Sequence, residues 1–128
     1  MKLNSKLFIV TAALLTLFTF SIDCRNTIAQ TPSDTALVTF VEIGAAKCIP
    51  CKAMQPIMKA VAEEYKGQVK VVFHDVWTPK GRDDAMKYYI RLIPTQVFLD
   101  KNGKEYYRHE GYFPKDEVVR VIKMQGVK

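Results

Sequence analysis

The chain has 128 residues, of which 48% are hydrophobic and 25% are charged, a composition typical of one globular domain. Its formal net charge is +6, but the basic residues are dispersed and no run of five or more occurs. Such a charge is a weak sign of nucleic-acid or anionic-lipid binding, and no nucleic-acid module is expected.

The first segment has the pattern of a secretory signal peptide. Two lysines precede the apolar stretch of residues 7–20, and the small residue Ala29 suits cleavage, so residues 1–29 are predicted to be removed. The stretch is shorter than the roughly 20 residues that span a bilayer. An uncleaved anchor is one alternative, and a lipoprotein modified at Cys24 is another, although Asp23 does not suit that processing.

The next segments place two cysteines at the start of a helix. Residues 30–35 form a polar linker, the folded domain is predicted over 36–128, and residues 36–43 are predicted to form a strand. Cys48 and Cys51 follow, separated by two residues, and they are the only cysteines after Cys24. A thiol at a helix start meets unpaired backbone N–H groups and the positive end of the helix dipole, which favour thiolate. The pair is therefore predicted to be a redox dithiol with no separate structural disulfide.

The rest of the chain alternates helical and strand patterns. Apolar residues recur at three- and four-residue spacing after Cys51, which predicts a helix ending near Gly67 and kinked at Pro56. The order β-α-β-α-β-β-α indicates an α/β domain with one core. The further predicted elements are a buried strand at 69–76, a short helix at 83–89, a strand at 95–99, a hairpin turn at 102–103, a strand at 105–108 and a helix at 115–125.

Several motifs together resemble a thioredoxin-like domain. They are the dithiol with its flanking residues 42–52, Pro56 in the following helix, Ile93-Pro94-Thr95 about 45 residues later, the hairpin turn, and Gly111. The resemblance covers residues 36–125 and implies a thioredoxin-like fold, a mixed central sheet flanked by helices. The chain lacks room for the first strand and helix of thioredoxin, so the minimal version of the fold is implied.

The resemblance implies distinct roles for the two sulfurs and for one acid. Cys48 would be the exposed nucleophile and Cys51 the buried resolving thiol, with no metal and no cofactor beyond their own disulfide. Glu42 aligns with a buried aspartate of thioredoxin, and as a buried carboxyl it would take a proton from Cys51. The alternative for Glu42 is a solvated acid on the exposed side of its strand.

The resemblance also implies a groove for partner proteins. Pro94 would be a cis proline facing the dithiol, leaving neighbouring backbone groups free to pair with a bound peptide. The other predicted groove residues are Lys47, Ile49, Pro50, Ile93, Thr95, Gly111 and Tyr112.

The predicted function is a thiol:disulfide oxidoreductase that reduces disulfides of proteins in the bacterial periplasm or at the outer face of the membrane. Ile49 and Pro50 bring no charge to Cys48, so thiolate gains no added support, and a potential below about −200 mV is expected. The resemblance implies a membrane thiol carrier as electron donor, and a monomer is expected. A disulfide oxidase or isomerase on the same fold is the alternative, and a thiol-based metal-binding module is a weaker one.

Overall fold

The computed structural model describes residues 36–128, which form a four-stranded sheet and three helices in the predicted order. The predicted signal peptide at 1–29, with Cys24, and the linker at 30–35 lie outside the described residues. No helix within residues 36–128 is long and apolar enough to cross a membrane. The elements are β1 (Val38–Gly44), α2 (Ile49–Glu64), β2 (Val69–Asp75), α3 (Pro79–Met86), β3 (Thr95–Asp100), β4 (Glu105–Glu110) and α4 (Lys115–Lys123).

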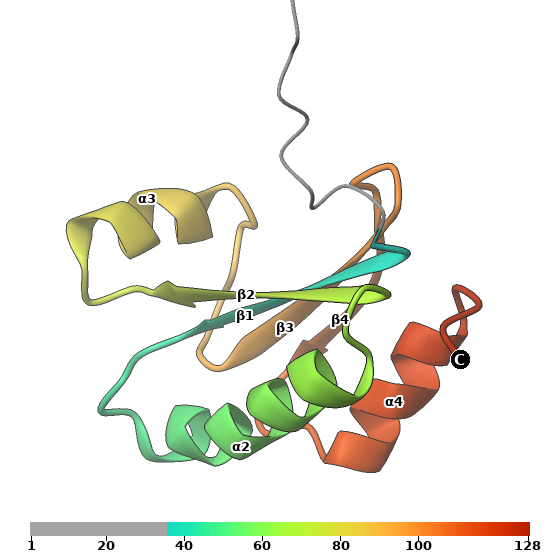
Figure 1. The fold of residues 1–128 in the computed structure, drawn as a ribbon. Helices are drawn as coiled ribbons and strands as arrows, with labels where there is room; N and C mark the ends of the chain where they lie inside the picture. Colours follow the sequence, from blue (N-terminus) through green and yellow to red (C-terminus); the bar gives the residue numbers. More distant parts are fainter. Residues whose placement is uncertain (1–35) are drawn as a thin grey trace, which may run out of the picture. The chain divides into compact units, whose positions relative to one another are not determined.

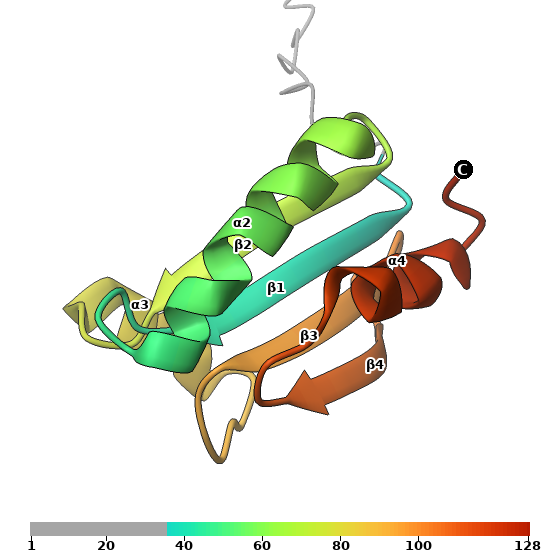
Figure 2. The same cartoon turned by 90° about the horizontal axis from the view of Figure 1, so that it is seen from below.

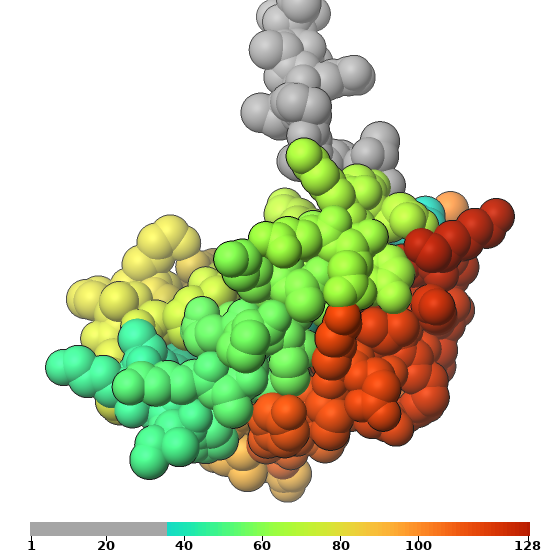
Figure 3. Space-filling view, turned by 60° about the horizontal axis from the view of Figure 1, so that its bottom comes forward, coloured from blue at the N-terminus to red at the C-terminus, as the bar shows by residue number. Residues whose placement is uncertain are grey.

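The sheet has the strand order β2-β1-β3-β4 and is mixed. Strand β1 runs parallel to β2 and antiparallel to β3, and β3 and β4 form an antiparallel hairpin. Helices α2 and α4 cover one face of the sheet and α3 covers part of the other (Figure 1 and Figure 2). Figure 3 shows α2 and α4 side by side on the first face.

The core lies on both faces of the central strands. On the α2 and α4 side, Phe40 stacks on Phe98 with ring centroids 4.9 Å apart, and Met54 of α2 packs into the same cluster. On the α3 side, Val41 and the other apolar side chains of that face pack against Ala85. Strand β1 is therefore buried from both sides. Its close-packed surroundings hold the end of the strand in a fixed position, from which the chain continues to the dithiol.

Two sequence predictions need correction. The strand predicted as buried at 69–76 is the edge strand β2, and Val69 is its one buried residue. Its valines indicate a strand but not its place in the sheet. The helix predicted at 83–89 begins earlier, because Thr78 caps it by accepting a hydrogen bond from the Gly81 N–H at 3.0 Å, and Pro79 follows at the first helical position.

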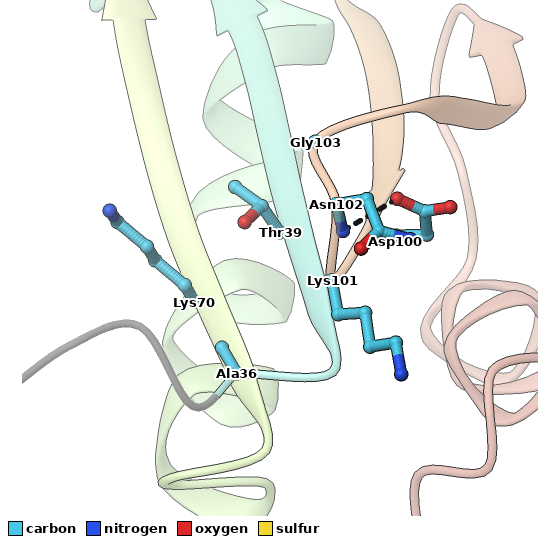
Figure 4. A pocket seen from close by; sticks show the side chains of 7 residues that line it. All are labelled: Ala36, Thr39, Lys70, Asp100, Lys101, Asn102 and Gly103. Atoms are coloured by element: carbon cyan, nitrogen blue, oxygen red, sulfur yellow. Dashed lines mark hydrogen bonds between the residues drawn. The ribbon is translucent and has the colours of Figure 1, made fainter.

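The β3–β4 turn is held by one carboxylate. Asp100 accepts hydrogen bonds from the backbone N–H groups of Asn102 at 2.8 Å and Lys104 at 3.0 Å, and Gly103 adopts a positive φ of 77°. A pocket of about 340 Å³ lies beside this turn, where β1 begins (Figure 4). This is the end of β1 remote from the dithiol, and no predicted site residue lines the pocket.

Candidate active site

Cys48 lies between the end of the central strand β1 and the first residue of α2. The residue is the N-cap of that helix, with φ −73° and ψ 126°, and its side chain is half-exposed. Its N–H donates to the Ala45 carbonyl at 3.1 Å and its carbonyl accepts from the Lys52 N–H at 2.9 Å. The first turn of α2 holds no acidic residue. The Cys48 sulfur therefore meets the positive end of the helix with no carboxylate in that turn to oppose thiolate.

Cys51 lies one turn further into α2 and is fully buried. Both cysteines are free thiols in this structure. Burial, and after it a hydrogen bond with the Cys48 sulfur, raise the pKa of the Cys51 thiol to about 12, although the Ala45 backbone lowers it in part. The two sulfurs thus differ in access, and Cys51 stays protonated near neutral pH unless a base takes its proton.

Glu42 supplies a carboxyl group beneath the dithiol. Its side chain is fully buried on β1, which excludes the solvated-acid alternative. Burial is the larger effect on the pKa of Glu42 and the neighbouring amide of Gln96 lowers it in part, which leaves that pKa raised to about 8. The Glu42 charge also raises the pKa of Cys51, so the two groups lie within electrostatic reach of each other.

The Pro94 loop lies at the same end of the sheet as the dithiol. Ile43 near the end of β1 pairs with Thr95 at the start of β3, and Thr95 pairs in turn with Glu110 at the end of β4. The Ile93–Pro94 peptide bond is cis, and the Pro94 carbonyl accepts a hydrogen bond from the Gly111 N–H at 2.8 Å. Within residues 36–128, neither the N–H nor the C=O of Ile93 forms a backbone hydrogen bond.

The predicted groove residues differ in their exposure. Ile49 is 83% exposed and Tyr112 is 51% exposed, so both present apolar surface to solvent. Thr95 is fully buried and its hydroxyl donates to the Leu92 carbonyl at 2.7 Å, so its side chain belongs to the loop and not to the surface of a groove. The exposed members are Lys47, Ile49, Pro50 and Tyr112, and the half-exposed ones are Ile93 and Gly111.

Sequence reasoning missed two residues that contact or face this site. A Cβ atom added to Gly44 would lie 3.1 Å from the Cys51 sulfur, so the absence of a side chain there lets Cys51 sit against the end of β1. Gln96 is fully buried and lies directly across from Glu42 in the β1–β3 register. A polar residue that alternates with Phe98 in a predicted strand was a usable signal for Gln96, whereas the contact of Gly44 depends on the fold.

Within residues 36–128, no group of three or more His, Cys, Asp or Glu side chains is arranged to hold a metal ion. The chemistry that the site does offer is the exchange of two sulfurs between thiol and disulfide.

Comparisons with known proteins agree with this geometry. A family model described as Thioredoxin matches residues 21–124. Thioredoxin C-2 of Corynebacterium nephridii is 34% identical over 94 residues, covering 73% of this chain and 79% of the relative. Thioredoxin 1 of Nostoc sp. is 30% identical over 97 residues, covering 76% and 88%.

Solved structures show the same fold. A mutant thioredoxin from Halobacterium salinarum NRC-1 superposes with a TM-score of 0.63 at 22% identity, over 73% of this chain and 77% of that chain. A crystal structure of chloroplastic thioredoxin z superposes with a TM-score of 0.61 at 30% identity, over 71% and 80%.

Proposed function

The chain belongs to the thioredoxin family of thiol:disulfide oxidoreductases, and on this premise we propose that it is an exported, monomeric reductase of protein disulfides. The observation that carries the proposal is the unequal environment of its two sulfurs. Cys48 is accessible at a helix N-terminus, and Cys51 is fully buried one turn away. The signal-peptide pattern of residues 1–29 supports export to the periplasm or the outer face of the membrane.

The reaction proceeds in two exchange steps. The Cys48 thiolate attacks one sulfur of the partner's disulfide, a Cys48–partner bond forms, and the other partner sulfur leaves with the electron pair as a thiolate. The Cys51 thiolate then attacks the Cys48 sulfur, the Cys48–Cys51 disulfide forms, and the second partner sulfur leaves as a thiolate. The partner gains two electrons and two protons, and the dithiol is oxidised.

The second step requires Cys51 to lose its proton, and we assign its acceptance to the Glu42 carboxylate. The pKa of Glu42 is about 8, so a minority of molecules carry the ionised carboxylate at neutral pH. That fraction grows as the pH rises, so the resolving step should accelerate through about pH 8. Glu42→Gln should remove this pH dependence while leaving the first attack by Cys48 intact.

The groove around Cys48 would hold the partner as an extended peptide. The backbone N–H and C=O of Ile93 are free within the described residues and can pair with a partner strand. Exposed Ile49 and Tyr112 offer apolar contacts beside Cys48, with Lys47, Pro50 and the backbone of Gly111 at the rim. Pro94 and Thr95 shape this loop from beneath.

The direction of the reaction rests on the two residues between the cysteines. Ile49 and Pro50 add no charge that would favour the reduced state, so we propose a reductant with a potential below about −200 mV. A reductant in an oxidising compartment needs a supply of electrons, for which we propose a membrane thiol carrier.

The decisive experiment traps the partner. Cys51→Ser in the full chain should hold its substrate as a mixed disulfide through Cys48, visible as a high-mass band that a reductant removes. Mass spectrometry of that band names the partner. The matched control is Cys48→Ser with Cys51 intact, which should form no adduct through Cys51 because that thiol is buried. Adducts of equal amount in both variants would contradict the assignment of roles.

Two measurements separate the competing functions. A redox titration with a midpoint well above −200 mV would favour the oxidase or isomerase. Tight binding of Cu⁺ or Zn²⁺ by the reduced protein, together with no reduction of insulin disulfides, would favour the metal-binding module.

A further inference from the structure

A second buried polar side chain lies next to Glu42 and has no role in the two exchange steps. Gln96 of β3 is fully buried, as is Glu42 of β1, and the two residues are direct partners in the antiparallel β1–β3 register. Side chains of directly opposed residues project to the same face of a sheet, with Cβ atoms about 5 Å apart. The carboxyl and the carboxamide are therefore neighbours inside the core.

Neither group has a hydrogen-bond partner among the described residues. Both carboxyl oxygens of Glu42 and both polar atoms of the Gln96 amide are buried and unpaired. Buried polar groups are nearly always paired in folded proteins, so four unpaired atoms on two adjacent side chains require an explanation. The two groups are adjacent, and the carboxamide offers the carboxyl both donors and an acceptor.

Among residues 36–128, Gln96 is the only polar residue that lies directly opposite Glu42 in the sheet. From β2 the opposed residue is the apolar Phe73, and from α2 the nearby titratable group is the Cys51 thiol. Beyond Gln96, the opposed residue on β4 is His109, whose ring stacks on Phe113 at 4.1 Å and whose Nε2 lies 3.2 Å from the Tyr112 carbonyl. His109 is thus engaged on the far side of Gln96.

We propose that Gln96 is a positioning residue for the resolving step, with a carboxamide that pairs with the Glu42 carboxyl in both of its protonation states. With Glu42 ionised, the amide N–H donates to the carboxylate. With Glu42 protonated, a flip of the amide group about its last side-chain bond lets its carbonyl accept the acid O–H, since a carboxamide offers two donors and an acceptor. This inference rests on the proposed role of Glu42 as the proton acceptor for Cys51.

The pair is stronger when Glu42 is ionised, because hydrogen bonds to charged groups are stronger than those between neutral groups. A donor aimed at a carboxylate favours the ionised form, and Gln96 lowers the pKa of Glu42 in this structure. Gln96→Leu removes the donor while keeping an apolar side chain of similar size. The titration midpoint of Glu42 should therefore rise, by about one pH unit for a hydrogen bond to a charged group.

The test follows the Glu42 carboxyl directly by ¹³C NMR in the reduced full chain. Gln96→Leu should raise its midpoint by about one pH unit, and Gln96→Met, which is unbranched, repeats the test if the leucine variant does not fold. His109→Phe is the matched control, and it should leave the midpoint unchanged because the ring lies beyond the amide. An unmoved midpoint in folded Gln96→Leu, or an equal rise in His109→Phe, would overturn the inference.

A second readout separates this inference from the proposed function. The pH profile of the resolving step, followed by rapid mixing of the Cys48–partner adduct, should shift with the carboxyl midpoint in Gln96→Leu. In a Glu42→Gln background the same leucine substitution should leave the profile in place. A midpoint that rises while the profile stays fixed supports the pairing of Gln96 with Glu42 and refutes Glu42 as the proton acceptor.

Discussion

The buried carboxyl of Glu42 should make the stability of the reduced protein fall as pH rises. The pKa of Glu42 is 4.5 in an exposed chain and about 8 in the fold, because burial penalises the charge. Between these values only the folded state holds the proton, so each pH unit lowers the free energy of unfolding by about 1.4 kcal/mol. The contribution is fully present below pH 4.5 and is lost by the time the pH has risen through about 8, which amounts to about 5 kcal/mol.

Glu42→Gln isolates this contribution, since glutamine matches the protonated acid in shape and cannot ionise. We expect the two proteins to be about equally stable near pH 4.5, and the variant to be more stable by up to about 5 kcal/mol above pH 8. Urea unfolding of both proteins under a non-thiol reductant, at steps of pH kept below 9, measures the difference, and the titration of Cys51 is common to both proteins and cancels from it. Parallel curves for the two proteins across that range would refute the reasoning.

Three further substitutions test local packing by urea unfolding. Gly44→Ala should lower stability by about 1–3 kcal/mol and slow resolution, because the new Cβ meets the Cys51 sulfur at 3.1 Å. Met54→Ala should cost about 2–5 kcal/mol, since it empties a buried site whose sulfur also accepts the Phe113 N–H at 3.3 Å. Gly103→Ala should cost about 1–2 kcal/mol, because its φ of 77° suits glycine and not alanine.

Two of these three substitutions have a matched comparison. Met124 is 58% exposed, so Met124→Ala should change stability by less than about 0.5 kcal/mol. Gly103→Asn should be milder than Gly103→Ala, since asparagine tolerates a positive φ. Equal losses within either pair, or unchanged resolution kinetics in Gly44→Ala, would contradict the packing described above.

The sequence predicts the element order because each element has its own local signal. The helix after Cys51 follows from apolar spacing, and the β3–β4 hairpin follows from the Asn102-Gly103 pair, which the structure places in a turn with Gly103 at positive φ. These signals depend on residues close in the chain, so they can be recognised without knowledge of the fold.

What the sequence leaves open depends on pairing between distant segments. A run of valines like that of β2 is compatible with either a central or an edge strand. The position of β2 at the edge follows from the strand order of the sheet. The burial of Glu42 and its neighbour Gln96 likewise follows from a β1–β3 register that joins residues 54 positions apart. The thiol-disulfide chemistry could be predicted from the two cysteines in the sequence. The buried residues Glu42 and Gln96 near them could be identified as neighbours only from the strand pairing.

The direction of β1 has a practical consequence for handling the protein. The chain enters the folded part at Val38 and reaches the dithiol just after Gly44, so entry point and sulfurs are separated by the length of one strand, about 20 Å. A bead, a fluorophore or a fusion partner attached upstream of residue 36 would therefore be linked to the folded domain at the end of β1 away from Cys48. Immobilisation through that route should leave turnover unimpaired, which makes the amino-terminal side the natural handle for capture experiments.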